Sequence, residues 1–320
     1  MNWQKLFSVD YYHRKFYRWL QSRKSHAFAW VLSRERYYNE TGRKLSYRNP
    51  GDINQKLMWL NRYSNDPKRA KCADKYLVRD YVIKCGYEDI LIPLLGIWEK
   101  VDDIKFDQLS DKFVLKCNHG AGMNVICKGK SIFDETEAKR KLDKWMGGCY
   151  DSMLQEKHYR LIKPRIICEQ YLEQLNGGII DYKFHCFNGK VHSCFVAYNR
   201  DVNNPLHSVD FDHYDIDWHL TEAIKPEFHK NRIVIQKPHC FERMLKICSD
   251  LSKGFPYVRV DLYEVNERVY FGEMTFTPNG NIMNYYSQEM LNELGKQLIL
   301  PDKNKLLLFP TLLEGGLYLE

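Results

Sequence analysis

The sequence lacks a long apolar stretch. Spanning a bilayer takes about 20 consecutive apolar residues, whereas the apolar segment 90–98 is short and is interrupted by Pro93. The first residues also lack the apolar core and the small-residue cleavage site of a secretory signal. Both absences predict a cytoplasmic protein without a membrane span.

The sequence also lacks the cysteine and glycine spacings of common cofactor sites. None of its ten cysteines forms a CxxC pair, and several, such as Cys117 and Cys168, lie in apolar strand-like runs. Cysteines of this kind behave as small core residues in a reducing compartment, so we expect neither a structural metal nor disulfides. No segment matches GxGxxG or GxxxxGK(S/T), so neither a Rossmann nor a P-loop site is indicated.

What is present is an ordinary globular composition with a basic excess. The 320 residues are 44% hydrophobic and 28% charged, and the formal net charge is +7. Much of the excess lies in 12–24, where Arg14, Lys15 and Arg18 are interleaved with aromatic residues. Such a segment can bind acidic polymers or anionic lipids, although the solvated face of a helix is the simpler interpretation. No nucleic-acid-binding module accompanies it, so we expect no nucleic-acid partner.

Hydrophobic periodicity predicts a mixture of helices and strands. The expected helices span about 1–45, 53–60, 71–82, 134–147 and 239–253. The expected strands span about 90–98, 113–117, 125–127, 165–171, 181–187, 191–197, 257–263 and 268–274. A hairpin turn is expected at Asn188-Gly189, and 200–235 looks like an irregular, polar insertion. Strands joined by hairpins rather than alternating with helices predict an α+β class with largely antiparallel sheets.

Lys116 is the first candidate functional residue. It lies in an apolar predicted strand and precedes a loop that contains His119, Gly120 and Gly122. A buried charge needs an anion nearby, and glycines let backbone N–H groups approach phosphate oxygens closely. The segment therefore suggests a phosphate-binding loop, although an outward-facing strand lysine gives the same pattern.

Two further segments carry polar residues on predicted strands. Glu169, followed by Tyr171 and Leu172, ends an apolar strand whose edge can present donors and acceptors to a purine. A plain strand end is the simpler interpretation. Asp181 and Lys183 alternate onto one face of the next strand. An acid there can take ribose hydroxyls while a base meets phosphates, but a cross-strand charge pair fits equally well.

The last two predicted strands hold the strongest candidates. Arg259 and Asp261 lie on one strand, and Glu273 and Thr275 on the next, with a short turn between the strands. Antiparallel pairing would place the two carboxylates close together, where they repel each other unless a cation lies between them. Mg²⁺ bound by one or two carboxylates and by nucleotide phosphates meets that need. Arg259 on the same face could neutralise a transferring phosphoryl group. A surface charge cluster is the alternative.

Taken in order, these segments resemble the ATP-grasp superfamily over about 113–285. Further motifs resemble its TupA-like group, named after a teichuronopeptide biosynthesis protein, and extend the resemblance to about 45–290. The motifs are Asn49-Pro50, Lys56-Leu57-Met58-Trp59-Leu60, Ala73-Asp74-Lys75-Tyr76 with Val78-Arg79, Ile92-Pro93-Leu94-Leu95-Gly96, Lys116-x-Asn118-His119-Gly120 and Gly272-Glu273-Met274-Thr275-Phe276-Thr277-Pro278. Proteins of this group are associated with surface-polysaccharide gene clusters and are often labelled glycosyltransferases.

The resemblance implies an ATP-grasp fold, in which two α+β subdomains clasp ATP. The implied domains are a basic helical segment at 1–45, a pre-ATP-grasp-like region at 46–110, an ATP-grasp domain at 111–290 and a C-terminal tail at 291–320. Within the third of these, the resemblance implies a small lid subdomain at 111–170 and a metal and phosphate subdomain at 171–290.

The resemblance also implies how ATP would be bound. The phosphates would be held by Lys116 and Lys183, beneath the loop that contains His119, Gly120 and Gly122. Adenine would lie at Glu169, Tyr171 and Leu172, and the ribose would lie at Asp181.

Mg²⁺ and the transferring group would lie at the last two strands. The resemblance implies that Asp261 and Glu273 carry the metal and that Arg259 stabilises the acylphosphate-forming step. Thr275 stands where many ATP-grasp enzymes have asparagine. Either its hydroxyl or a later amide would complete the metal shell, and the number of metal ions stays open.

We therefore expect an ATP-dependent carboxylate–amine ligase in capsule or other surface-polysaccharide biosynthesis. The expected substrate is an acidic glycan or an amino acid, and the basic N-terminal segment would hold the glycan or the inner membrane surface. A glycosyltransferase, a sugar kinase and a nucleotide-binding scaffold without turnover are the alternatives. A transferase often carries a DxD metal motif. Asp215 and Asp217 fit it formally, but they fall in the irregular segment and look like a pair of loop acids.

Overall fold

The computed structural model describes residues 29–64, 66–148, 156–173, 179–199, 209–228 and 233–303. The predicted basic segment around Arg14, Lys15 and Arg18 lies outside these residues, as does most of the predicted C-terminal tail. Within the described part of the chain, no helix has the length and apolar character that crossing a bilayer requires. The predicted α+β class is confirmed, because helices accompany two antiparallel sheets.

Several helices precede the first strand. They are α2 (Ala29–Thr41), α3 (Ile53–Tyr63), α4 (Pro67–Ala73) and α5 (Val78–Lys84). The side chain of Asp52 caps α3 by accepting a hydrogen bond from the backbone N–H of Gln55. The predicted continuous helix at 71–82 is wrong. Oδ1 of Asp74 accepts hydrogen bonds from the backbone N–H groups of Tyr76 and Leu77, at 2.7 and 3.3 Å, and this local turn interrupts the helix.

The first sheet has four strands in the order β1-β4-β2-β3. They are β1 (Leu94–Trp98), β2 (Phe113–Cys117), β3 (Asn124–Cys127) and β4 (Ile166–Gln170). Alternation along β2 buries Phe113, Leu115 and Cys117 completely, against α6 (Glu135–Met146). Short 3₁₀ helices lie in the connections, at η3 (Glu88–Ile90), η4 (Val101–Asp103), η5 (Phe106–Gln108), η6 (Lys130–Ile132) and η7 (Lys157–Leu161). The opposite face of β2 presents Lys116.

The second sheet has five strands in the order β7-β6-β5-β8-β9. They are β5 (Asp181–Phe187), β6 (Lys190–Tyr198), β7 (Asp210–Asp215), β8 (Val258–Val265) and β9 (Arg268–Thr275). The predicted hairpin between β5 and β6 is present, and both Asn188 and Gly189 have the positive φ that such a turn requires. The prediction that 200–235 is irregular is wrong in part. Strand β7 lies there, and its polar sequence Asp210–Asp215 hides it from a search for apolar alternation.

The two faces of the second sheet pack against different helices. One face, with Phe184, Val260 and Met274, packs against α7 (Phe241–Leu251). The other face packs at its β6 side against α3 and α8 (Gln288–Gln297). Two 3₁₀ helices, η8 (Pro226–Phe228) and η9 (Pro278–Asn281), lie in the connections.

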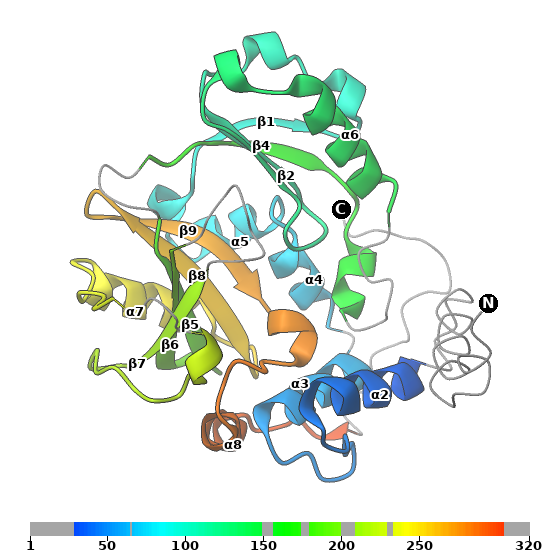
Figure 1. Ribbon diagram of the computed structural model, residues 1–320, viewed down its shortest axis with the longest axis vertical. Coiled ribbons are helices and arrows are strands. Elements are labelled where there is room, and N and C mark those ends of the chain that lie inside the picture. The colour runs from blue at the N-terminus through cyan, green and yellow to red at the C-terminus, as the bar shows by residue number, and fades with distance from the viewer. Residues whose placement is uncertain are drawn as a thin grey trace, which may run out of the picture.

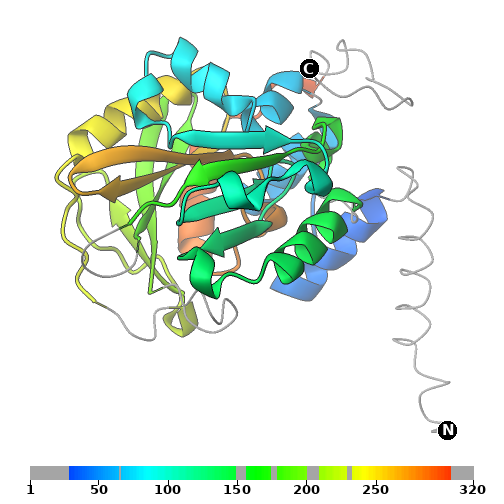
Figure 2. The same ribbon diagram turned by 90° about the horizontal axis from the view of Figure 1, so that it is seen from above.

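Helices α4 and α5 lie between the two sheets (Figure 1). Helix α4 packs against β9 and against η7. Turning the molecule by 90° shows α6 and α7 on opposite flanks (Figure 2). The segment from α4 to α5 is therefore placed to contact both sheets.

Candidate functional site

Three neighbouring strands of the second sheet bring charged side chains into one row. In the register of β5, β8 and β9, Lys183 lies opposite Asp261, and Asp261 lies opposite Glu273. Residues directly opposite each other on antiparallel strands have Cβ atoms about 4.5–5.5 Å apart. The predicted proximity of Asp261 and Glu273 is therefore confirmed, and Lys183 belongs to the same row.

Arg259 lies two residues earlier on β8 and forms a buried ion cluster with this row. Its Nε and Nη2 donate to Oδ1 and Oδ2 of Asp261, both at 2.7 Å. Lys183 Nζ donates to the same Oδ2, also at 2.7 Å. Asp261 is 0% exposed, Arg259 8% and Lys183 9%. Burial works against the charged form of Arg259, but the Asp261 carboxylate holds the pKa of the guanidinium well above its ordinary value. Arg259 is therefore a permanent cation.

Glu273 is more open to a further ligand than Asp261. Its side chain is 33% exposed, it accepts a hydrogen bond from the Thr275 hydroxyl at 3.1 Å, and it lies 3.8 Å from Arg259. Carboxylate oxygens suit Mg²⁺, so the partly exposed Glu273 fits a magnesium ion. The Thr275 oxygen already accepts a hydrogen bond from Arg259 Nη2 at 3.2 Å. Both oxygens of Asp261 already accept hydrogen bonds from Arg259 and Lys183. Asp261 therefore fits a metal less well, because an ion would have to displace donors that bind both of its oxygens at 2.7 Å.

Asp181 lies at the start of β5, beside the row. Its Oδ2 is 3.3 Å from Lys183 Nζ, and its side chain is 8% exposed. Lys183 thus lies between two carboxylates, those of Asp181 and Asp261. The predicted ribose contact of Asp181 stays a prediction.

Lys116 forms an ion pair on the first sheet. Its Nζ donates to Oε2 of Glu169, on the neighbouring strand β4, at 2.6 Å. Nη1 of Arg79, on α5, lies 3.5 Å from the other oxygen of Glu169. The resemblance implied that Glu169 lies beside adenine. In the structure, the Glu169 carboxylate forms ion pairs with Lys116 and Arg79. Tyr171 and Leu172 follow β4 and are half-buried, and the adenine contacts of all three residues stay predictions.

The loop between β2 and β3 is fixed at its start and exposed at its end. His119 is 3% exposed, and its Nε2 lies 3.2 Å from the carbonyl oxygen of Trp145. Burial lowers the pKa of His119, which favours a neutral ring at pH 7. Gly122 has a φ of +71° and is exposed, whereas Gly120 is buried. His119 therefore anchors the loop, and the exposed backbone near Gly122 is the part left for a ligand.

Lys75 joins the two sheets, and the sequence did not identify it as a site residue. Its Nζ donates to the carbonyl oxygen of Gly120, in the loop of the first sheet, and lies 3.9 Å from Oε2 of Glu273, in the second. The side chain is 12% exposed. Lys75 does belong to the motif Ala73-Asp74-Lys75-Tyr76, but that motif gives no sign of contacts so distant along the chain.

The formal DxD motif lies at the opposite edge of the second sheet. Oδ1 of Asp215 accepts hydrogen bonds from the backbone N–H groups of Asp217 and His219, and its Oδ2 lies 3.0 Å from the His219 ring. In the described part of the chain, these three side chains have ligand atoms close enough to hold a cation, but Asp217 and His219 are exposed. The hydrogen bonds of Asp215 close the turn after β7, which is a structural role for a loop acid.

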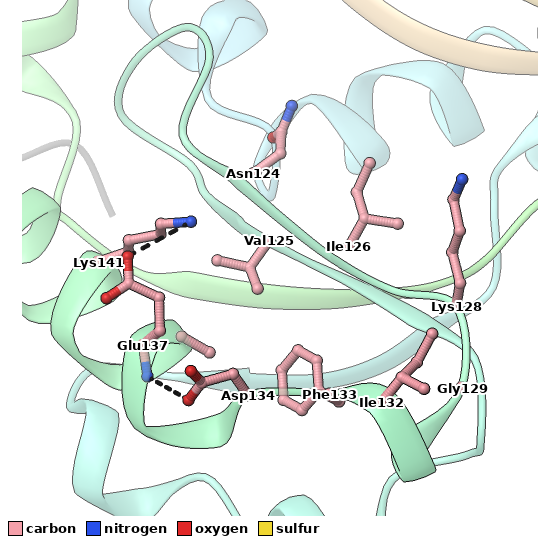
Figure 3. A pocket seen from close by; sticks show the side chains of 11 residues that line it. Asn124, Val125, Ile126, Lys128, Gly129, Ile132, Phe133, Asp134, Glu137 and Lys141 are labelled. Atoms are coloured by element: carbon pink, nitrogen blue, oxygen red, sulfur yellow. Dashed lines mark hydrogen bonds and ion pairs between the residues drawn. The ribbon is translucent and has the colours of Figure 1, made fainter. Parts of the chain in front are cut away.

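A separate hollow of about 370 Å³ lies between β3 and α6 (Figure 3). Figure 3 shows Asn124, Ile126 and Lys128 on one side of β3, and Val125 on the other side with Glu137 of α6. The residues that line this hollow include no predicted site residue. The hollow is therefore distinct from the cluster of predicted residues.

The cluster can accommodate a polyanion next to a divalent cation. Arg259 and Lys75 lie 3.8 and 3.9 Å from the partly exposed carboxylate of Glu273. Lys183 binds Asp261 in the same row, and Lys116 is near enough to Lys75 to lower its pKa. Fixed charges in a site sheltered from water stabilise developing negative charge more strongly than they do in water. Such an arrangement can support phosphoryl transfer by positioning and by charge neutralisation.

A family model described as TupA-like ATPgrasp matches residues 55–299. Among the solved structures that resemble the chain is D-alanine–D-alanine ligase from Bacillus anthracis complexed with ATP. It is 15% identical, with a TM-score of 0.45, over 73% of this chain and 67% of that one. The D-alanine–D-alanine ligase from Helicobacter pylori is 13% identical, with a TM-score of 0.42, over 79% of this chain and 70% of that one. The ATP-grasp ligase PsnB, complexed with a phosphomimetic variant of its minimal precursor, Mg and ADP, is 10% identical, with a TM-score of 0.40, over 74% and 62%. A search of the curated proteins finds no match.

Proposed function

Since the chain belongs to the TupA-like ATP-grasp family, we propose that it uses the γ-phosphate of Mg-ATP to activate a carboxylate and then joins that carboxylate to an amine. The match to this family confirms the ATP-grasp fold that the resemblance implied. The observation that carries the proposal is the row of Lys183, Asp261 and Glu273 on three neighbouring strands, with Arg259 bound to its centre. This row supplies cations for phosphates and an open carboxylate for magnesium within one small volume.

The proposed reaction has two steps. An oxygen of the substrate carboxylate attacks the γ-phosphorus of ATP, and the bond between this phosphorus and the bridging oxygen of ADP breaks. The amine nitrogen then attacks the carbonyl carbon of the acylphosphate, phosphate leaves with the bonding electron pair, and the nitrogen loses a proton. In this proposal Lys116 and Lys183 hold ATP phosphates, and Arg259 neutralises the phosphoryl group during transfer. Magnesium at Glu273 would add positive charge beside the phosphates.

Lys183 would change partners when the nucleotide binds. In the structure its ammonium group contacts Asp261 at 2.7 Å and Asp181 at 3.3 Å. A phosphate group carries more negative charge than a carboxylate and competes for the same donor. Movement of Lys183 towards a phosphate would remove one of the two donors to Oδ2 of Asp261 and leave the Arg259 donor in place. A metal contact of Asp261 is therefore favoured only in the nucleotide-bound state.

The proposed setting is the biosynthesis of capsule or another surface polysaccharide, with an amino acid or a uronic-acid glycan as the substrate. The TupA-like family and the net charge of +7 support an acidic substrate. We include in this proposal a contact between the basic N-terminal segment and the acidic glycan or the inner membrane surface. Reversing the charges of Arg14, Lys15 and Arg18 should then weaken binding to acidic polysaccharide and to anionic liposomes. If the variant bound both as tightly as the wild type, the proposed contact of the N-terminal segment would be refuted.

The test of the main proposal is an assay for ADP and phosphate with a panel of amino acids and uronic-acid glycans, each offered with amine acceptors. The ligase predicts ADP, free phosphate and an amide product. A phosphorylated acceptor without free phosphate would indicate a kinase, and release of UDP from a sugar nucleotide would indicate a transferase.

Glu273→Gln is the diagnostic variant for this assay. Because it removes the most open carboxylate of the cluster, we expect kcat to fall by about 100-fold or more, as is typical when one electrostatic contact to a transition state is lost. Glu242→Gln, which breaks the exposed ion pair with Lys237, is the matched control and should keep wild-type turnover. Normal turnover of Glu273→Gln would count against the metal assignment.

A further inference from the structure

Arg259 has hydrogen-bond donors that its ion cluster does not use. Its Nε and Nη2 donate to Asp261, and Nη2 also donates to the Thr275 hydroxyl at 3.2 Å. These contacts account for three of the five N–H donors of a guanidinium. In the described part of the chain, the two donors on Nη1 make no hydrogen bond. Arg259 can therefore bind a further oxygen atom without releasing Asp261.

Three tyrosine hydroxyl groups lie around this guanidinium. Burial raises the pKa of Tyr257, Tyr285 and Tyr286, and in each case the charge of Arg259 acts in the opposite direction. An effect of this kind requires the cation to lie near each hydroxyl group. All three tyrosines are at least nine-tenths buried, so bulk water does not supply their hydrogen bonds.

His185 accounts for two of the three hydroxyl groups. It lies opposite Arg259 in the register of β5 and β8 and is 0% exposed. Its Nδ1 lies 2.9 Å from the Tyr257 hydroxyl, and its Nε2 lies 2.8 Å from the Tyr286 hydroxyl. Burial lowers the pKa of His185 well below its ordinary value, so the ring is neutral and offers one donor and one acceptor. Both of these hydroxyl groups are therefore engaged by a neutral partner beside Arg259.

The third hydroxyl group, that of Tyr285, is buried and has no hydrogen-bond partner among the described residues. The ring of Tyr285 stacks on Phe195, with the ring centroids 4.7 Å apart. Phe195 lies opposite Lys183 in the register of β5 and β6, so Tyr285 covers the same face of the sheet as the charged row. A buried polar group without a partner is unfavourable and calls for an explanation. Its place beside unused donors of Arg259 indicates a site for an oxygen atom of a ligand.

We infer that Tyr285 is a catalytic residue whose hydroxyl group, together with Arg259, donates to an oxygen of the phosphoryl group as it passes to the substrate carboxylate. This inference rests on the proposed function, because it requires phosphoryl transfer at Arg259. The hydroxyl keeps its proton throughout, since burial raises the pKa of Tyr285 to about 12. Donors aimed at developing negative charge lower the barrier most where water is excluded. Glu273 and Thr275, beside Arg259, are partly exposed and leave an opening for the ligand.

This role predicts effects of opposite sign on stability and on binding. Without a ligand, the Tyr285 hydroxyl is a buried polar group with no partner, so its removal should not destabilise the protein. With a phosphoryl group in place, the same hydroxyl has an acceptor, so its removal should weaken binding. A hydroxyl group with a structural role would instead contribute to stability whether or not a ligand is bound.

Tyr285→Phe is the test variant, because it removes the hydroxyl group and keeps the ring that stacks on Phe195. Its Tm, measured by circular dichroism, should be about 2 °C above that of the wild type. Tyr81→Phe is the matched control. The Tyr81 hydroxyl donates to the carbonyl oxygen of Leu251 at 2.9 Å, so this variant should lose about 2–4 °C in Tm and keep wild-type turnover. Tyr285→Met also lacks the hydroxyl and serves as the second variant if Tyr285→Phe does not fold.

Orthovanadate bound together with Mg-ADP is the probe for the transferring phosphoryl group, whose geometry it imitates. Isothermal titration calorimetry measures the binding of Mg-ADP first, and then the binding of vanadate to the Mg-ADP complex. Tyr285→Phe should bind Mg-ADP as tightly as the wild type and vanadate about tenfold more weakly, as expected for one lost hydrogen bond to a charged group. In the assay for ADP release, kcat should fall about 100-fold, as is typical when one donor to a transition-state oxyanion is removed.

Three outcomes would overturn the inference. If Tyr285→Phe melted as far below the wild type as Tyr81→Phe does, the Tyr285 hydroxyl would have a structural role. If Tyr285→Phe bound vanadate as tightly as the wild type, Tyr285 would not contact the phosphoryl group, and the proposed function would be unaffected. If the wild-type protein bound neither Mg-ADP nor vanadate, the nucleotide site of the proposed function would fail, and the role of Tyr285 would fail with it.

Discussion

Replacing Asp261 by asparagine should destabilise the protein strongly, even though the change in shape is small. The carboxylate accepts two hydrogen bonds from Arg259 and one from Lys183, all at 2.7 Å. All three residues are at least nine-tenths buried. The asparagine side chain would be neutral, so two buried cations would lose their nearest anion while the amide oxygen still accepted one of the hydrogen bonds. The instability therefore arises from the charges left behind.

The size of this effect follows from the burial of the cluster. Removing one partner of a buried ion pair costs about 3–5 kcal/mol, because the remaining charge is left without compensation in a region of low dielectric constant. We expect a loss of about 4 kcal/mol for Asp261→Asn. A domain of this size loses about 2–4 °C in Tm for each kcal/mol, so Tm should fall by about 10 °C.

Thermal unfolding followed by circular dichroism measures this change. Asp89→Asn is the matched control, because it breaks an aspartate–arginine pair with Arg243 whose side chains are 58% and 47% exposed. Exposed pairs contribute about 0–1 kcal/mol, so the control should lose no more than about 4 °C. If Asp261→Asn melted within error of Asp89→Asn, the claim that Asp261 compensates Arg259 and Lys183 would be refuted.

Two further predictions concern the backbone beside Glu273 and the response to acid. A Cβ at Gly272 would lie 2.9 Å from the carbonyl oxygen of Asp261, at the bulge between β8 and β9. Gly272→Ala should therefore cost about 1–3 kcal/mol and lower ADP release, whereas Gly51→Ala, where a Cβ meets open space, should leave both Tm and ADP release unchanged. Burial lowers the pKa of His213 from 6.5 to about 3, so the unfolded chain binds a proton more readily, and stability is lost as pH falls from 6.5 towards 3. Between about pH 7.5 and 5.0 this loss is about 2 kcal/mol. His213→Gln should therefore remove this loss. Urea titrations at the two pH values measure the free energy of unfolding, and a variant with the same pH dependence as the wild type would contradict the role given to His213.

Much of the secondary structure was predictable because its signals are local. Alternation and turn residues located β5 and β6 and the hairpin at Asn188 between them, and amphipathic spacing located α6 and α7. Strand β7 was missed because its sequence Asp210–Asp215 is polar. The break after α4 was missed because it depends on Asp74, whose side chain closes a turn that competes with the helix.

The candidate site was predictable to the extent that it lies on adjacent strands. Asp261 and Glu273 could be paired from the sequence because a short turn joins β8 to β9 and so sets their register. Lys75 could not be placed, because it meets Gly120 and Glu273 only when α4 packs against β9 and the turn after α4 meets the loop of the first sheet. The role of His119 also depended on packing, since its partner is a backbone carbonyl at the end of α6.

The sequence by itself determined the local elements, the family resemblance and the set of charged residues on the last two strands. Only the tertiary structure decided which charge neutralises which. It joined Lys183 and Arg259 to Asp261, left Glu273 partly open, and brought Lys75 from outside both sheets. The physical reason is that the energy of an ion pair depends on the distance between the charges and on their burial. For residues far apart in the chain, both quantities are set by the packing of the elements that carry them.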